Sequence, residues 1–477
     1  MRKLRAALLL LAISSLPLAA AIGQPVKVDG GLVAGAPGRD PAISAFKGVP
    51  FAAPPTGDLR WRAPRPVVAW QGVRKADRFS ASCMQNIVAE RKPWTYEFMA
   101  HNDVSEDCLY LNVWTPAKTA SEKRPVFVYL YGGGFNEGSA AVPAYDGEGL
   151  ASKGLVVVTI NYRVGVLGFL AHAGLSGENE HHASGNYGLL DQVAALQWVQ
   201  RNIARFGGDP ARVAVAGQSA GGMSVHALIA SPLGKGLFSR AIVESGGSSV
   251  GGGGISVGFR KLDAAEAEGQ RFLQAKGAAS LADLRAMNWQ KLTEPVNGAG
   301  PFRFAPVVDG YLLPAGIAET VAQGKHNDVP TLTGVNLGEL SGLTPQTPLT
   351  AKLFEDRARQ RYGTLADEFL RLYPATSDEQ ARAAQIESSR DQALVSMYLW
   401  AQRRAGTSHT PAYTYLWDHT LPGPDAGRFG AFHTSEVPYV LNTLFASERP
   451  FTPADRKIAD LMSSYLANFA TAGDPNG

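Results

Sequence analysis

The stretch that decides the fold spans residues 213–228 and reads Val-Ala-Val-Ala-Gly-Gln-Ser-Ala-Gly-Gly-Met-Ser-Val-His-Ala-Leu. Residues 213–216 are small or β-branched, as in a buried strand, and residues 222–228 can form a helix. The intervening Gly217-Gln218-Ser219-Ala220-Gly221 matches the Gly-x-Ser-x-Gly pattern. In this nucleophile elbow a strained turn exposes the serine hydroxyl, and small neighbours permit the turn. The stretch therefore predicts Ser219 as a nucleophile.

A second match to the pattern occurs at Gly247-Ser248-Ser249-Val250-Gly251. It also follows an apolar run, but it leads into four consecutive glycines at residues 251–254. Glycine is a poor helix former, so no stable helix is expected to begin there. We interpret Ser249 as a loop residue.

Short apolar runs alternate with longer helical patterns along the chain. Runs without polar alternation fit strands that are buried on both faces. Helices are expected at residues 189–206 and 219–231, and residues 352–405 form a largely helical region before the last strand. The sequence therefore predicts an α/β fold: a large, mostly parallel sheet covered by helices, with a helical insertion at about 350–405. The expected strands are 109–115, 126–131, 156–160, 213–216, 241–244, 329–335 and 413–417.

A serine hydroxyl needs a base, and the base needs a carboxylate that holds its tautomer. Behind an elbow of this type the acid precedes the histidine in the chain. Glu339 follows the predicted strand 329–335 and could turn inward or remain a solvated loop residue. The histidines that follow the elbow at a plausible distance are His326, His409, His419 and His433. Spacing alone leaves His419 and His433 comparable as the base.

The loop Leu130-Tyr131-Gly132-Gly133-Gly134-Phe135 follows another predicted strand. Glycines suit an oxyanion hole, because backbone N–H groups must approach a developing negative charge. A plain glycine turn is the simpler alternative. A dinucleotide-binding loop is excluded because the position three residues after Gly134 is Glu137 rather than glycine.

The chain begins with a predicted signal peptide at residues 1–23. Arg2, Lys3 and Arg5 precede an apolar stretch that ends in small residues, and the stretch is too short for a membrane anchor. The formal net charge of +3 equals these three basic residues. The mature protein is therefore close to neutral, which argues against nucleic acid as a partner.

Export implies an oxidising compartment, so the protein is expected to be secreted or periplasmic. Cys83 and Cys108 are the two cysteines, and a disulfide between them is the simplest expectation there. Two cysteines without a nearby pair of histidines cannot make an ordinary zinc site. No metal is therefore expected. Residues 24–477 are expected to form a single domain.

Together these motifs resemble those of the type B carboxylesterase and cholinesterase family, which has the α/β-hydrolase fold. Besides the elbow and the glycine loop, Ser-Glu-Asp-Cys-Leu-Tyr-Leu-Asn at 105–112 resembles a second signature of that family. Further segments that resemble motifs of the family occur at 185–192, 206–210 and 306–310, in the same order as in the family.

The resemblance implies roles that spacing left open. Residues 334–339 resemble the segment that carries the acid, and 430–439 the segment that carries the base. By this comparison Ser219, Glu339 and His433 form the catalytic triad. The other implied roles are oxyanion-hole donors at Gly133, Gly134 and Ala220, support of the triad by Ser245, the Cys83–Cys108 disulfide and an ion pair of Arg60 with Glu106.

The expected reaction is hydrolysis of a small-molecule carboxylic ester through an acyl-enzyme, without a cofactor. Phe302 and Phe304 are candidates for the acyl side of the pocket, although core packing is the commoner fate of such residues. The same triad could serve a lactonase, thioesterase or amidase. A non-catalytic binding protein of the same fold is a further alternative, which the intact triad residues disfavour.

Overall fold

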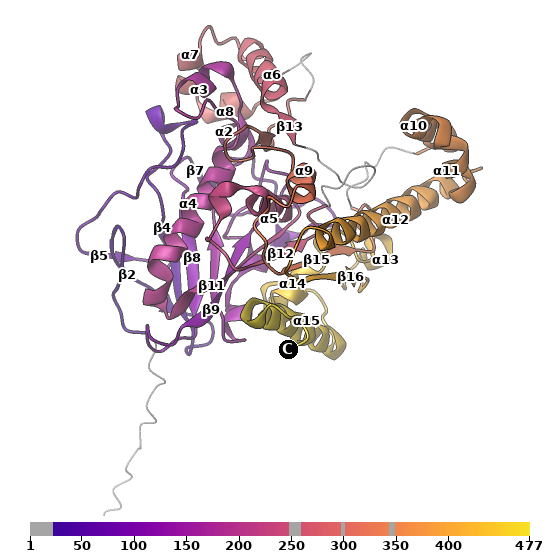
Figure 1. The fold of residues 1–477 in the computed structure, drawn as a ribbon. Helices are drawn as coiled ribbons and strands as arrows, with labels where there is room; N and C mark the ends of the chain where they lie inside the picture. Colours follow the sequence, from indigo (N-terminus) through magenta and orange to yellow (C-terminus); the bar gives the residue numbers. More distant parts are fainter. Residues whose placement is uncertain (1–21, 248–258, 297–300, 343–348) are drawn as a thin grey trace, which may run out of the picture.

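The computed structural model describes residues 22–247, 259–296, 301–342 and 349–477. The predicted leader falls almost entirely outside these ranges, as does Ser249. Within the described residues, nine strands form one mixed sheet (Figure 1). In spatial order they are β16 (Ala412–Trp417), β15 (Thr331–Asn336), β12 (Arg240–Glu244), β11 (Gly208–Gln218), β9 (Arg124–Leu130), β10 (Val156–Ile160), β8 (Tyr110–Thr115), β4 (Ser44–Pro50) and β3 (Ala36–Pro37).

The sheet has a parallel part and an antiparallel part. Neighbours from β16 to β10 are parallel, whereas β10–β8, β8–β4 and β4–β3 are antiparallel. All residues of β10 and most of β9 and β11 are buried, as expected for parallel strands covered on both faces. The edge strand β16 instead has exposed residues at alternate positions.

Helices cover the sheet and connect its strands (Figure 1). α5 packs against β11 and β12, α4 against β11, and α15 against β9 and β11. The helices are α1 (Glu148–Ala151), α2 (Gly165–Phe169), α3 (Ala173–Gly177), α4 (Tyr187–Asn202), α5 (Ala220–Ala230), α6 (Leu262–Ala275), α7 (Leu281–Ala286), α8 (Trp289–Thr293), α9 (Ile317–Ala322), α10 (Ala351–Tyr362), α11 (Ala366–Leu372), α12 (Asp378–Ala405), α13 (Ala426–Phe429), α14 (Val437–Val440) and α15 (Pro453–Ala472).

The predicted helical insertion before the last strand consists of α10, α11 and α12. The C-terminal part of α12 lies on the body, where the helix packs against α9, β15 and β16. Its other end carries α10 and α11 away from the sheet (Figure 1). These helices share a small apolar core formed by Leu349, Phe354, Ala381 and Ala384.

The predicted strands are all present, with small shifts at their ends. The predicted strand 213–216 is the buried centre of the longer β11, and the predicted helix 189–206 is α4 followed by a 3₁₀ turn at Ile203–Phe206. The sequence prediction missed β4, which carries Lys47 and Gly48 in its middle and pairs with β8 through an irregular register. It also missed three small sheets: β1 (Val26–Val28) with β2 (Gly31–Ala34) and β5 (Val73–Lys75), β6 (Ser82–Cys83) with β7 (Val104–Ser105), and β13 (Arg260–Lys261) with β14 (Val307–Val308).

Candidate active site

Ser219 stands between β11 and α5 in a strained backbone conformation, with φ 57° and ψ −120°. Its N–H donates to the carbonyl of Glu244 (2.8 Å), and its own carbonyl accepts from the N–H of Met223 (2.9 Å). Glycine is required beside it, because a Cβ on Gly221 would lie 2.0 Å from the Leu130 carbonyl oxygen. The sequence thus holds the serine at the end of the central strand, in the sharp bend that an elbow needs.

His433 and Glu339 meet beside this bend. Glu339 lies in the loop after β15, and His433 in the segment between α13 and α14. His433 Nδ1 forms a short hydrogen bond with Glu339 Oε2, while Glu339 Oε1 accepts from the backbone N–H of Asn336 (2.8 Å). Both residues are 5% exposed. The carboxylate is therefore fixed on both oxygens and orients the imidazole.

Burial and charge act in opposite directions on the imidazole. Burial lowers the pKa of His433, but the charge of Glu339 and its hydrogen bond raise it more, so that the net pKa lies above its ordinary value. Glu436 lies nearby and is fully buried. Desolvation first, and the charge of Glu339 second, raise the pKa of Glu436 to about 7.

His433 Nε2 contacts Gln218 rather than Ser219. Gln218 Nε2 lies 3.2 Å from His433 Nε2, and no hydrogen bond between the Ser219 hydroxyl and His433 is present in the described structure. All three side chains line one cavity. The structure thus brings Ser219 and His433 to the same cavity without joining them directly.

The glycine loop after β9 faces the same cavity. Gly133 and Gly134 have φ values of 111° and 62°, and a Cβ on Gly133 would lie 2.2 Å from the carbonyl oxygen of Glu137. No other described residue accepts a hydrogen bond from the N–H of Gly133, Gly134 or Ala220. Ala220 is the first residue of α5, where helix N–H groups lack internal partners. These three groups are available to an anionic oxygen.

His419, which spacing in the sequence left comparable to His433 as the base, lies elsewhere. His419 Nε2 bonds with Asp455 Oδ1 (2.8 Å), and the same carboxylate accepts from the Tyr439 hydroxyl. Its partners thus come from α14 and the N-terminal end of α15. Only His433 of this pair contacts Glu339.

The cavity at Ser219 has a volume of about 560 Å³. Its wall combines apolar and polar side chains, among them the ion pair of Arg91 with Glu137. Phe302 and Phe304, the candidates for the acyl side, are not among the described residues that line this cavity. Each packs edge-to-face on Phe272 at 5.1 Å between ring centroids, because their segment runs along α6. They form part of a hydrophobic cluster.

Ser245 directly follows β12 and lines the cavity at Ser219. Its N–H donates to the carbonyl of Gly334 (2.9 Å), and its buried hydroxyl contacts no hydrogen-bond partner among the described residues. Together with Glu339 and His226 it lines a small cavity of about 30 Å³. Ser245 is therefore adjacent to the acid, although it makes no direct bond with it.

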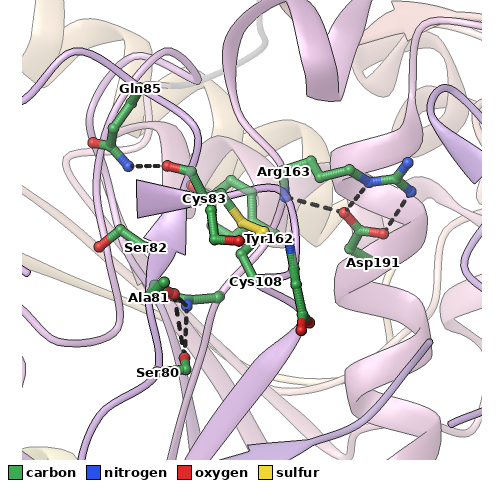
Figure 2. The surroundings of a disulfide bond; sticks show 12 residues. Ser80, Ala81, Ser82, Cys83, Gln85, Cys108, Tyr162, Arg163 and Asp191 are labelled. Atoms are coloured by element: carbon green, nitrogen blue, oxygen red, sulfur yellow. Dashed lines mark hydrogen bonds and ion pairs between the residues drawn. A yellow bond between two sulfur atoms is a disulfide. The ribbon is translucent and has the colours of Figure 1, made fainter. Parts of the chain in front are cut away.

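One wall of the active-site cavity is anchored by a disulfide. Cys83 and Cys108 are bonded as predicted (Figure 2). Gln85 Nε2 donates to the carbonyls of Cys83 (2.9 Å) and Gly138 (2.7 Å), which ties this segment to the residues that follow the glycine loop. Beside it, Arg163 and Asp191 form a fully buried ion pair (Figure 2).

The sequence analysis missed the contacts of Trp94 at this wall. Trp94 Nε1 lies 3.2 Å from both the His433 carbonyl and the Thr434 hydroxyl, so it holds the backbone at His433. Arg60, by contrast, pairs with Glu106 as the resemblance implied, with Nε 2.8 Å from Oε2.

The described residues contain no group of three or more histidine, cysteine, aspartate or glutamate side chains that could hold a metal ion. Nor does any described helix combine the length and hydropathy that a membrane crossing requires.

Comparison with known proteins decides the family. The profile described as "Carboxylesterase family" matches residues 23–477. The chain belongs to this family. As a carboxylesterase, it is a carboxylic ester hydrolase with an α/β-hydrolase fold, as its sequence motifs predicted.

Curated carboxylesterases are similar to the chain over most of its length. Fumonisin B1 esterase of Sphingopyxis macrogoltabida is 38% identical, and the alignment covers 98% of this chain and 86% of that protein. Cocaine esterase of Oryctolagus cuniculus is 35% identical over 92% of this chain and 85% of that protein. Para-nitrobenzyl esterase of Bacillus subtilis is 34% identical over 91% of this chain and 87% of that protein.

Proposed function

We propose that this carboxylesterase hydrolyses its ester through an acyl-enzyme on Ser219, with His433 as general base and acid and Glu339 as the carboxylate that orients it. The observation that carries the proposal is the buried His433–Glu339 hydrogen bond beside a serine held in a strained bend. The N–H groups of Gly133, Gly134 and Ala220 have no other partner in the described structure, and the two glycines line the cavity at Ser219.

In the first step Ser219 Oγ attacks the ester carbonyl while His433 Nε2 takes its proton. The tetrahedral oxyanion accepts hydrogen bonds from the N–H groups of Gly133, Gly134 and Ala220, and its collapse expels the alcohol, which receives the proton from His433. Water then repeats the sequence on the acyl-enzyme and releases the acid and the free serine. Glu339 keeps its hydrogen bond to Nδ1 and stabilises the imidazolium.

We propose small-molecule carboxylic esters as the substrate class. The cavity of about 560 Å³ accommodates a drug-sized ligand. The names of the similar proteins refer to chemically different esters, which supports the class rather than one member of it.

We also propose that the protein acts outside the cytoplasm, in a secreted or periplasmic form without residues 1–23. The Cys83–Cys108 disulfide supports an oxidising compartment. N-terminal sequencing of the protein exported by its native host tests this: a chain that begins near residue 24 is expected, and an uncleaved cytoplasmic chain contradicts it.

The mechanism is tested by Ser219→Ala. Turnover of a nitrophenyl ester should fall by about 10³-fold or more, because only binding and the oxyanion hole remain. Ser249→Ala is the matched control, since it removes the serine of the second Gly-x-Ser-x-Gly sequence and should leave turnover unchanged. A fluorophosphonate should label the wild type at Ser219. Near-normal hydrolysis by Ser219→Ala, or an adduct on another serine, refutes the assignment.

A further inference from the structure

Gln218 occupies the position next to the nucleophile, at the end of β11, and its side chain is 1% exposed. The side chain does not extend into the sheet core. It lies on the wall of the Ser219 cavity, with its amide between the glycine loop and His433. A buried amide in this position has few possible hydrogen-bond partners. The directions of its nitrogen and oxygen therefore indicate which neighbouring atoms accept and which donate.

The nitrogen of this amide faces the base. Gln218 Nε2 lies 3.2 Å from His433 Nε2, and an amide NH₂ can only donate. His433 Nε2 must therefore accept with its lone pair, while Nδ1 donates to Glu339. This lone pair is the one that must take the proton of Ser219.

The oxygen of the amide faces the glycine loop. Gln218 Oε1 lies 2.8 Å from the position that a Cβ on Gly132 would occupy, so only glycine leaves room for it there. In this orientation the amide binds neutral imidazole and offers no acceptor to imidazolium. An amide turned by 180° would present Oε1 instead, and would bind the protonated ring.

The charged groups around His433 come from several elements. Glu339 approaches from the loop after β15, and Glu436 lies in the segment of His433 itself, at the start of α14. Arg91 and Glu137 lie on the cavity wall, paired with each other. Gln218 is the neutral group among them, and it contacts the ring nitrogen that reacts.

We propose that, in the acyl transfer assigned above, Gln218 is a positioning residue that occupies His433 Nε2 in the resting enzyme. Substrate binding must displace this amide from the ring before Ser219 can reach the base. The contact keeps the imidazole neutral and aligned, and prevents its premature protonation. It also explains why Ser219 and His433 share a cavity without a direct hydrogen bond.

The test is the pH profile of kcat/KM for Gln218→Met and Gln218→Glu. Methionine has a similar size but no donor, so neutral His433 loses a stabilising bond and the acid limb should move upward by about 0.5 to 1 pH unit. Glutamate adds a charge at this contact, so the limb should move upward by about 1 to 3 pH units. If Gln218 had only a packing role, its replacement would leave the acid limb of the pH profile unchanged.

Two controls sharpen the comparison. Asn86→Asp adds a carboxylate to an exposed position on the same cavity wall, away from His433, and should move the limb far less than Gln218→Glu. The rate of fluorophosphonate labelling of Ser219 should show the same limb as kcat/KM, because both depend on His433. Should the methionine variant fail to fold, Gln218→Asn replaces it, since the shorter amide cannot reach the ring.

An unmoved acid limb in the Gln218 variants overturns the inference, as does an equal shift in Asn86→Asp. The proposed mechanism fails separately: in that case Ser219→Ala stays active or the fluorophosphonate does not label Ser219. An inactive Ser219→Ala combined with an unmoved limb would reject the role of Gln218 alone.

Discussion

Replacement of Glu436 by glutamine should make the protein increasingly stable, relative to the wild type, as the pH rises from 4.5 to 7. The carboxyl group is fully buried, and Asn336 Nδ2 donates to its Oε2 while Oε1 has no partner among the described residues. Desolvation and the nearby charge of Glu339 raise the pKa of Glu436 to about 7, from an ordinary value of 4.5.

The sign follows from proton linkage. Between these two values the unfolded chain has released the proton while the folded protein retains it, so the free energy of unfolding falls as the pH rises. Glu436 thus contributes stability that is fully present below pH 4.5 and lost as the pH passes 7. At about 1.4 kcal/mol per pH unit, the loss amounts to about 3 kcal/mol across this interval. Glutamine stays neutral, can still accept from Asn336, and removes the loss.

Urea unfolding, followed by tryptophan fluorescence at half-unit steps from pH 4.5 to 8, measures this difference. The stability of Glu436→Gln minus that of the wild type should rise by about 3 kcal/mol, most of it before pH 7. Glu448→Gln is the control, because it removes an exposed carboxylate of a nearby segment. A difference that is the same at every pH would refute the reasoning.

Three further predictions concern the glycine loop, the disulfide and the buried ion pair. Gly133→Ala should lower kcat for a nitrophenyl ester by about 10²- to 10³-fold, because the added Cβ displaces the loop. Replacement of Cys83 and Cys108 by alanine should lower the free energy of unfolding by about 3 kcal/mol, measured in urea, since the disulfide closes a loop of 25 residues. Asp191→Asn should cost about 3 to 5 kcal/mol in the same assay, because it leaves the Arg163 guanidinium buried beside a neutral group.

The parallel half of the sheet was predictable because its strands are continuous apolar runs. The run around Val156–Ile160 has no polar alternation and is buried at every position. β4 escaped prediction because Lys47 and Gly48 interrupt its apolar pattern and its pairing with β8 is irregular. Short two- and three-residue strands depend on neighbours far away in the chain, which a local pattern does not reveal.

The candidate site, too, has a part that the sequence predicts and a part that it does not. Ser219 and the glycine loop are local features, since each depends on a strand, a turn and small residues in one stretch. His433 and Glu339 meet only after folding, so spacing left His419 open, and the family resemblance was needed to choose. The contact of Gln218 with His433 had no signal in the sequence, because it joins positions that are distant in the chain.

The pocket prediction for Phe302 and Phe304 illustrates a different limit. From the sequence, the two aromatic side chains could form a substrate wall or a packed cluster, and packing is the commoner fate. The structure places both against Phe272, because α6 offers an apolar ring at the right distance. Local sequence does not tell which neighbour an aromatic side chain will find.

The wall that begins at Cys83 offers a route to altered selectivity. It is secured by the disulfide, by the bond of Gln85 to Gly138 and by the bond of Trp94 to the backbone of His433. Between these anchor points, residues 86–88 are exposed and border the cavity without holding any catalytic group. Substitutions at these three positions should therefore change which ester the enzyme hydrolyses, while the reactive centre keeps its alignment.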